Sequence, residues 1–129
     1  MARRSDQRRD AVFATYQHDV TGRPLDELLT GAKPFTRALA EGTEQHREEL
    51  DGLIASHAEG WTFDRIAPLE RSIMRVALYE VEHRDDVPTE VALDEAVNLA
   101  KEYCGTDTPS FVNGILGAAV RAAVGEGEN

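Results

Sequence analysis

The amino-acid sequence predicts an all-α fold, with about six or seven helices arranged as two small helical bundles packed into one domain. Apolar residues recur at spacings of three and four along nearly the whole chain, which is the period of an amphipathic helix. No segment shows the alternation typical of a strand, and glycine or proline separates the periodic segments. Because only 6% of the 129 residues are aromatic, the predicted core is aliphatic and rich in alanine.

The N-terminal half, residues 1–60, is expected to hold three helices. The first covers 5–19, a short one covers 25–31, and a long one follows Pro34 over about 35–57. The apolar residues of the long helix recur in steps of three and four, so they share one face. The predicted members of this face are Phe35, Leu39, Gly42, His46, Leu50, Leu53, Ile54 and His57.

The C-terminal half, residues 61–124, is expected to hold a short turn at 64–66 and then three helices. These cover about 68–83, 89–104 and 109–124, and the remaining residues 125–129 are expected to be a disordered tail. The predicted buried residues of the first two helices are Ile73, Met74, Ala77, Leu78, Val81, Ala92, Leu93, Ala96, Val97, Ala100 and Tyr103.

The last helix contains Asn113-Gly114, a dipeptide that usually indicates a β-hairpin. The apolar residues around it keep a helical spacing, and Thr108 and Pro109 supply a cap and a first helical residue. Asn113 and Gly114 are therefore predicted to be helical. A glycine inside a helix costs about 1 kcal/mol relative to alanine. Our interpretation is that Gly114 allows a neighbouring helix to approach closely and that Asn113 bonds to the crossing segment.

Catalytic, metal-binding and membrane-spanning features are not expected. The four histidines lack the spacings of zinc motifs, and the single Cys104 fits a reducing cytoplasm. His46 and His57 lie eleven residues apart on one helix face, where structural histidines are favoured over metal ligands. Phosphate-binding glycine motifs and long apolar runs are missing as well. We expect a cytoplasmic protein without catalytic activity, cofactor or metal.

Charge is distributed unevenly along the chain. The net charge is −10, yet residues 1–9 hold four arginines and one aspartate, which leaves −13 on the rest. Positive charges at a helix N-terminus oppose the helix dipole, so this basic arm suggests a bound anion such as RNA. A solvated terminus is the simpler alternative. Four phosphate contacts on single-stranded RNA predict a log–log salt slope of about −3. Tyr16, Tyr103 and Phe111 are available for stacking on bases.

Three segments together resemble the NusB family of bacterial transcription antitermination factors. They are RRDAVFATYQHDV, LERSIMRVALYEVEHRDDVPTEVALDEAVNLAKEY and SFVNGIL. The resemblance implies two small helical bundles without catalytic activity. It also implies a role with NusE, a ribosomal protein that doubles as a transcription factor. Together the two hold the boxA element of nascent ribosomal RNA and bring it to RNA polymerase, within the antitermination complex.

The resemblance implies site residues as well. Those expected to contact RNA are Arg3, Arg4, Arg8, Arg9, Lys101, Asp107 and Phe111. Those expected to contact NusE are Tyr16 and Glu70. Asn113 and Gly114 belong to the family signature and are interpreted as structural. Many members carry lysine where this chain has Ser110, so one phosphate contact beside Phe111 is expected to be missing.

Two alternatives remain open at this point. The chain is a helical protein–protein adaptor or homodimer that does not bind RNA, or it is a stand-alone relative of the RNA-recognition domain of ribosomal RNA methyltransferases. The first predicts a role for the acidic surface alone. The second requires a downstream α/β domain that binds a cofactor, which we do not expect here because no glycine-rich strand–helix motif is present.

Overall fold

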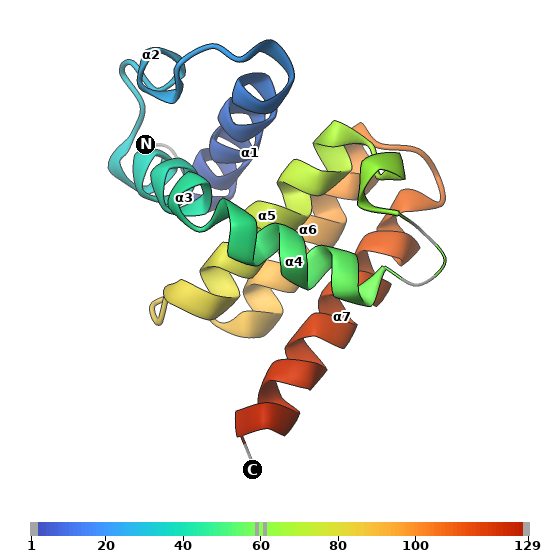
Figure 1. Cartoon of the computed structure of the whole chain (residues 1–129). Coiled ribbons are helices and arrows are strands. Elements are labelled where there is room, and N and C mark those ends of the chain that lie inside the picture. Colours follow the sequence, from blue (N-terminus) through green and yellow to red (C-terminus); the bar gives the residue numbers. More distant parts are fainter. Residues whose placement is uncertain (1–2, 59, 61, 128–129) are drawn as a thin grey trace.

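The computed structural model describes residues 3–58, 60 and 62–127, and within this part of the chain every regular element is helical (Figure 1). The prediction of an all-α fold is confirmed. No helix within the described ranges is long and apolar enough to cross a membrane. The elements are α1 (Arg4–Thr21), α2 (Leu25–Leu28), α3 (Pro34–Gln45), α4 (Arg47–His57), the 3-10 helix η1 (Phe63–Arg65), α5 (Pro68–His83), α6 (Thr89–Tyr103) and α7 (Thr108–Gly127).

Helix α5 is the central element of the fold. It packs against α1, α3, α4, α6 and α7, and Figure 1 shows α4 lying across both α5 and α7. Its side chains are buried without interruption from Ser72 to Leu78, as expected for a helix surrounded by others. One core of aliphatic side chains extends from Ala11 to Ala119. Elements on both sides of residue 60 therefore share a single core.

The expected long helix over 35–57 is wrong, because the chain bends at His46. This residue has φ −107° and ψ 17°, outside the helical region, and separates α3 from α4. Its ring Nδ1 donates to the carbonyl oxygen of Gly42 at 2.9 Å, and the ring packs at a tilt against His83 of α5, with centroids 3.9 Å apart. A side chain that engages the preceding turn in this way is a known cause of helix kinks.

Helix α7 confirms that Asn113 and Gly114 are helical, but the interpretation of Gly114 as a packing glycine is wrong. Both residues are exposed, and a Cβ at Gly114 would meet nothing within 4 Å. Thr108 is the first helical residue and not a cap, since its hydroxyl donates to Glu70 at 3.0 Å. The helix also continues to Gly127, so residues 125–127 of the expected disordered tail are helical. Residues 128–129 lie outside the described part.

Gly42 in α3 has the role that was assigned to Gly114. A Cβ added at Gly42 would overlap the ring of Tyr79 from α5. The absence of a side chain therefore lets this aromatic ring lie directly on the α3 backbone.

A buried ion pair joins the start of α1 to the end of α5. The Arg8 guanidinium donates through Nε to both carboxylate oxygens of Glu80, at 2.8 and 2.9 Å, and through Nη2 at 2.6 Å. Arg8 is 3% exposed and Glu80 is fully buried. Burial raises the pKa of Glu80 above its ordinary value of 4.5, although the bonds from Arg8 act in the opposite direction.

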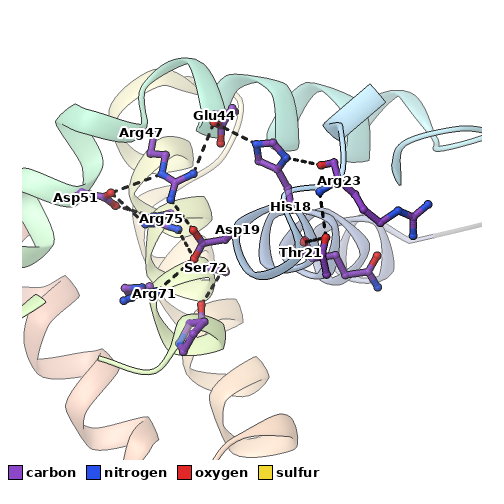
Figure 2. Close-up of polar contacts among 12 residues, drawn as sticks. His18, Asp19, Thr21, Arg23, Glu44, Arg47, Asp51, Arg71, Ser72 and Arg75 are labelled. Carbon is purple, nitrogen blue, oxygen red and sulfur yellow. Dashed lines mark hydrogen bonds and ion pairs between the residues drawn. The ribbon is translucent and has the colours of Figure 1, made fainter. Parts of the chain in front are cut away.

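A second cluster joins the end of α1 to the start of α5. Figure 2 shows Asp19 of α1 between Arg47 of α4 and Arg71 and Arg75 of α5, and it forms ion pairs with all three. Burial raises the pKa of Asp19, but the charges of Arg75 and Arg47 outweigh it and hold this pKa below 3.8. Stabilisation by Asp19 is therefore present above about pH 4 and is lost as the pH falls through the lowered pKa.

The contact between Gly42 and Tyr79 leads to a prediction with a matched control. Gly42→Ala should lower the free energy of unfolding by about 1–3 kcal/mol, because the Tyr79 ring must move. Gly52→Ala in α4, where a Cβ would meet nothing within 4 Å, should raise it by about 0.5–1 kcal/mol. Urea unfolding followed by circular dichroism measures both. Equal effects of the two substitutions would show that Tyr79 does not constrain Gly42.

The buried Arg8–Glu80 pair leads to a pH-dependent prediction. Arg8→Met should lower the free energy of unfolding at pH 7 by about 3–5 kcal/mol, because Glu80 keeps its burial and loses its partner. Without Arg8 the pKa of Glu80 rises further above 4.5, and a carboxyl group with a raised folded-state pKa favours folding more as the pH falls. The difference in free energy of unfolding between Arg8→Met and the unsubstituted chain should therefore become smaller as the pH is lowered from 7 toward 4.5.

The control for this measurement is Arg9→Met, one residue away and partly exposed. It should change the free energy of unfolding by less than about 0.5 kcal/mol at either pH. An Arg8→Met deficit that stays constant between pH 7 and pH 4.5 would contradict the explanation based on a buried Glu80 carboxylate.

Candidate functional site

The basic start of α1 is less available to an anion than its sequence indicates. Arg4 forms an ion pair with Asp86 at 2.8 Å and lies over the Phe35 ring, 4.2 Å from its centroid. Arg9 lies 3.4 Å from Asp6 and 3.3 Å from Asp10. Arg3 is exposed at the N-cap and forms no ion pair with any residue from 3–58, 60 or 62–127. Most of the positive charge at this end is thus balanced by nearby carboxylates.

The buried position of Arg8 argues against the RNA contact expected for it from the sequence. Its guanidinium is held inside the protein by Glu80, and Nη1 lies 3.7 Å from the carboxylate of Glu95. The reason is helical geometry, because Arg8 lies on the face of α1 that packs on α5, whereas Arg9 is turned 100° away. We therefore remove Arg8 from the candidate phosphate contacts.

Arg4 differs from Arg8 because its ion pair is exposed. Hydrogen bonds from Arg84 and Arg4 lower the pKa of Asp86 to about 2, so this carboxylate is ionised at neutral pH. A phosphate would have to compete with Asp86 for Arg4 in an exchange of one anion for another. Exposed pairs of this kind are weak, so the exchange is feasible.

Three of the expected site residues meet where α5, the α6–α7 turn and α7 come together. Glu70, Asp107 and Phe111 line a cavity of about 200 Å³, together with Arg65, Ile66 and Thr108. The bond from Thr108 to Glu70 holds the first turn of α7 against α5. The family resemblance implied that Glu70 contacts NusE and that Asp107 and Phe111 contact RNA, but the structure places all three around one cavity.

Phe111 also lines a second hollow, on the side toward α4. This cavity has a volume of about 430 Å³, and Ser110, Gly114 and Arg121 of α7 lie opposite Ser56 and His57 of α4. Phe111 therefore lies between two hollows, with Arg65 lining one and Arg121 lining the other. Both arginines are exposed, and neither has an ion-pair partner within the described ranges.

Arg65 and Arg121 were not identified from the sequence. Each is separated from other arginines and lysines by several residues, without the clustering that drew attention to residues 3–9. We find no sequence motif that marks either of them, because their position beside Phe111 depends on how η1 and α7 pack.

Tyr16 lies on a different surface, along the outer face of α1. Arg9, Phe13, Tyr16 and Val20 follow each other at spacings of four, three and four, so they share one side of the helix. Phe13 packs edge-on against Tyr103 at the end of α6, with ring centroids 5.0 Å apart. Val20 is 48% exposed and Tyr103 39% exposed. This α1 face is an accessible, partly apolar strip.

Lys101 lines neither hollow beside Phe111 and is not part of the strip on α1. It is exposed on α6, three residues after Asn98, and it has no ion-pair partner in the described part of the chain. Asn98 helps line a hollow between α6 and the start of α1. Three carboxylates and one guanidinium line this hollow, namely Asp6, Glu95, Glu102 and Arg9. The guanidinium of Arg9 is already paired with Asp6 and Asp10, so this hollow offers a phosphate no unpaired cation.

Comparison with known proteins agrees with this architecture. The family model described as the NusB family matches residues 5–121. The transcription antitermination protein NusB of Geobacillus kaustophilus is 44% identical over 128 residues, which cover 95% of this chain and 98% of that protein.

Two solved structures share the fold. NusB of T. maritima superposes with a TM-score of 0.83 at 27% identity, covering 93% of this chain and 92% of that one. A structure of antitermination factors NusB and NusE in complex with double-stranded RNA gives a TM-score of 0.81 at 26% identity, covering 95% and 99%. The family model spans most of the chain, and the likeness to curated NusB proteins is nearly full-length. The chain belongs to the NusB family of transcription antitermination factors.

Proposed function

We propose that this chain is a non-enzymatic RNA-binding adaptor. Together with NusE it binds the boxA element of nascent ribosomal RNA in the cytoplasm and delivers it to the antitermination complex on RNA polymerase. The observation that carries the proposal is the surface around Phe111, where an aromatic side chain lies between two hollows and each hollow has an unpaired arginine. Base stacking combined with phosphate contacts is the usual way to bind single-stranded RNA.

The likeness to a NusB–NusE–RNA complex supports both partners. In that solved structure a NusB protein is bound together with NusE and double-stranded RNA, and this chain superposes on NusB over 95% of its length. The net charge of −10 would attract a basic ribosomal protein. The exposed strip on α1, with Tyr16 at its centre, and Glu70 beside the Phe111 cavity are the proposed NusE contacts.

Gly114 has a place in this proposal. Packing does not explain it, since a Cβ at this position would meet only open space. It lines the larger hollow beside Phe111, one turn further along α7. A helical glycine costs about 1 kcal/mol relative to alanine, and close approach of a ligand would offset that cost. We propose that Gly114 keeps this surface open to the RNA backbone.

Specific RNA recognition is tested by titrating labelled boxA RNA and a scrambled RNA, with and without NusE, at two salt concentrations. We expect tighter binding to boxA and a further gain when NusE is present. Equal, weak binding to both RNAs that NusE does not change would favour the alternative of an adaptor without RNA. Light scattering over a range of protein concentrations then separates a monomer from a homodimer.

The two unpaired arginines give a sharper prediction. The double variant Arg65→Ala/Arg121→Ala should make the log–log salt slope less negative by about 1.4, because each lost contact with single-stranded RNA removes about 0.7. The control Arg23→Ala/Lys33→Ala removes the same charge from exposed positions in the segments that flank α2, and it should leave the slope unchanged because neither residue lines a hollow beside Phe111. If both double variants change the slope equally, binding depends only on overall charge.

Gly114→Ala separates stability from function. The substitution should raise the free energy of unfolding by up to about 1 kcal/mol, because alanine favours the helix and the site is open. It should also weaken boxA binding in the same titration. Gly52→Ala, also at an open helical position, should stabilise the protein without affecting RNA. Unchanged RNA affinity in Gly114→Ala would remove Gly114 from the proposed interface.

A further inference from the structure

Three potential metal ligands from two helices and the bend between α3 and α4 lie together on the side of the molecule where α5 ends. They are His46 at the bend, Glu49 in the first turn of α4 and His83 in the last turn of α5. Their ligand atoms all lie within 4.8 Å of one another, and His83 Nε2 is 3.1 Å from the Glu49 carboxylate. Glu49 and His83 are exposed and His46 is half-buried, so an ion from solvent can reach all three.

The hydrogen bond of His46 fixes which ring nitrogen is available. Its Nδ1 lies 2.9 Å from the carbonyl oxygen of Gly42, and a carbonyl only accepts hydrogen bonds. Nδ1 therefore carries the proton, which leaves the lone pair of Nε2 in the neutral ring free to bind a metal. A bond from the second nitrogen to a backbone carbonyl is the usual support for a histidine ligand.

The rings are also held in place by packing. Tyr79 stacks near His83 with centroids 5.5 Å apart, and lies 5.7 Å from His46. Tyr79 reaches this position because Gly42 has no side chain, and the same glycine provides the carbonyl that bonds His46. Gly42 and Tyr79 thus form a support behind the two histidines.

We propose that His46, Glu49 and His83 form a binding site for a divalent transition metal of the Zn²⁺ class. Two imidazole nitrogens and one carboxylate oxygen make a three-ligand set that leaves a fourth position for water. Imidazole favours zinc-like ions over Mg²⁺ or Ca²⁺, which prefer oxygen ligands alone. The bound ion would link the α3–α4 bend to the end of α5. This proposal does not depend on RNA or NusE binding.

The experiment is a calorimetric titration of the full chain, free of any histidine tag, with Zn²⁺. We expect one ion bound per chain. His46→Gln and His83→Gln should each weaken Zn²⁺ binding by more than about 100-fold. Loss of a residue that only supports a ligand costs about 10–100-fold in metal affinity, and loss of the ligand itself should cost more. Co²⁺ should give the visible absorption bands of a four-coordinate site, and Zn²⁺ should raise the melting temperature of the unsubstituted chain. Mg²⁺ at the same concentration should produce neither effect.

His57→Gln is a closely matched control. His57 is also on α4, and its Nδ1 makes the same type of bond, to the carbonyl oxygen of Leu53 at 2.9 Å, but it is not part of the cluster. It should bind Zn²⁺ like the unsubstituted chain. The proposal is overturned if the chain binds no Zn²⁺ at micromolar concentrations, or if His57→Gln weakens binding as much as His83→Gln does.

Discussion

The fold depends on the antiparallel pairing of α1 with α5, which is held by two clusters of opposite polarity. At one end a cation of α1, Arg8, meets an anion of α5, Glu80. At the other end an anion of α1, Asp19, meets the cations Arg71 and Arg75 of α5. In a parallel pairing the arginines would face each other at one end and the carboxylates at the other, so only the antiparallel order satisfies every buried charge.

The helix dipoles explain why these charges are placed where they are. Arg8 near the start of α1 and Asp19 near its end both oppose the dipole of their own helix. In the antiparallel pair, however, Arg8 lies beside the C-terminal end of α5, and Asp19 lies beside its N-terminal end. Each charge is therefore unfavourable in the isolated helix and favourable in the pair. The unusual basic start of α1 has a structural cause as well as its proposed functional one.

Most of the helical architecture was predictable because it depends on local periodicity and on proline and glycine positions. The helix over 68–83 was predicted with the bounds that the structure shows, and the spacing around Asn113-Gly114 correctly outweighed the hairpin signal. The bend at His46 was not predictable, since the His46 ring that bonds the Gly42 carbonyl also packs against His83 and Tyr79, which lie more than 30 residues away. The roles of Gly42 and Gly114 were not predictable either, because only packing shows which glycine has a neighbour.

The candidate site was harder to predict because arginine serves two purposes in this chain. Twelve of the fourteen basic residues are arginine, and many use the planar guanidinium to bind a carboxylate with two nitrogens, as Arg8, Arg75 and Arg84 do. These arginines are part of the fold and have little charge left for phosphate. The basic residues without an ion-pair partner in the described ranges are Arg3, Arg23, Lys33, Arg65, Lys101 and Arg121.

This distinction changes where the RNA-binding charge should be sought. Clustering in the sequence pointed to residues 3–9, yet three of the four arginines there are paired with carboxylates. Arg65 and Arg121 are isolated in the sequence, but they lie on either side of Phe111 and have no carboxylate to displace. Binding a phosphate at these two positions requires no exchange of partners, so each contact retains more of its electrostatic gain. In this acidic protein we therefore place the proposed RNA surface at the unpaired cations beside Phe111, and not at the cations that are close together in sequence.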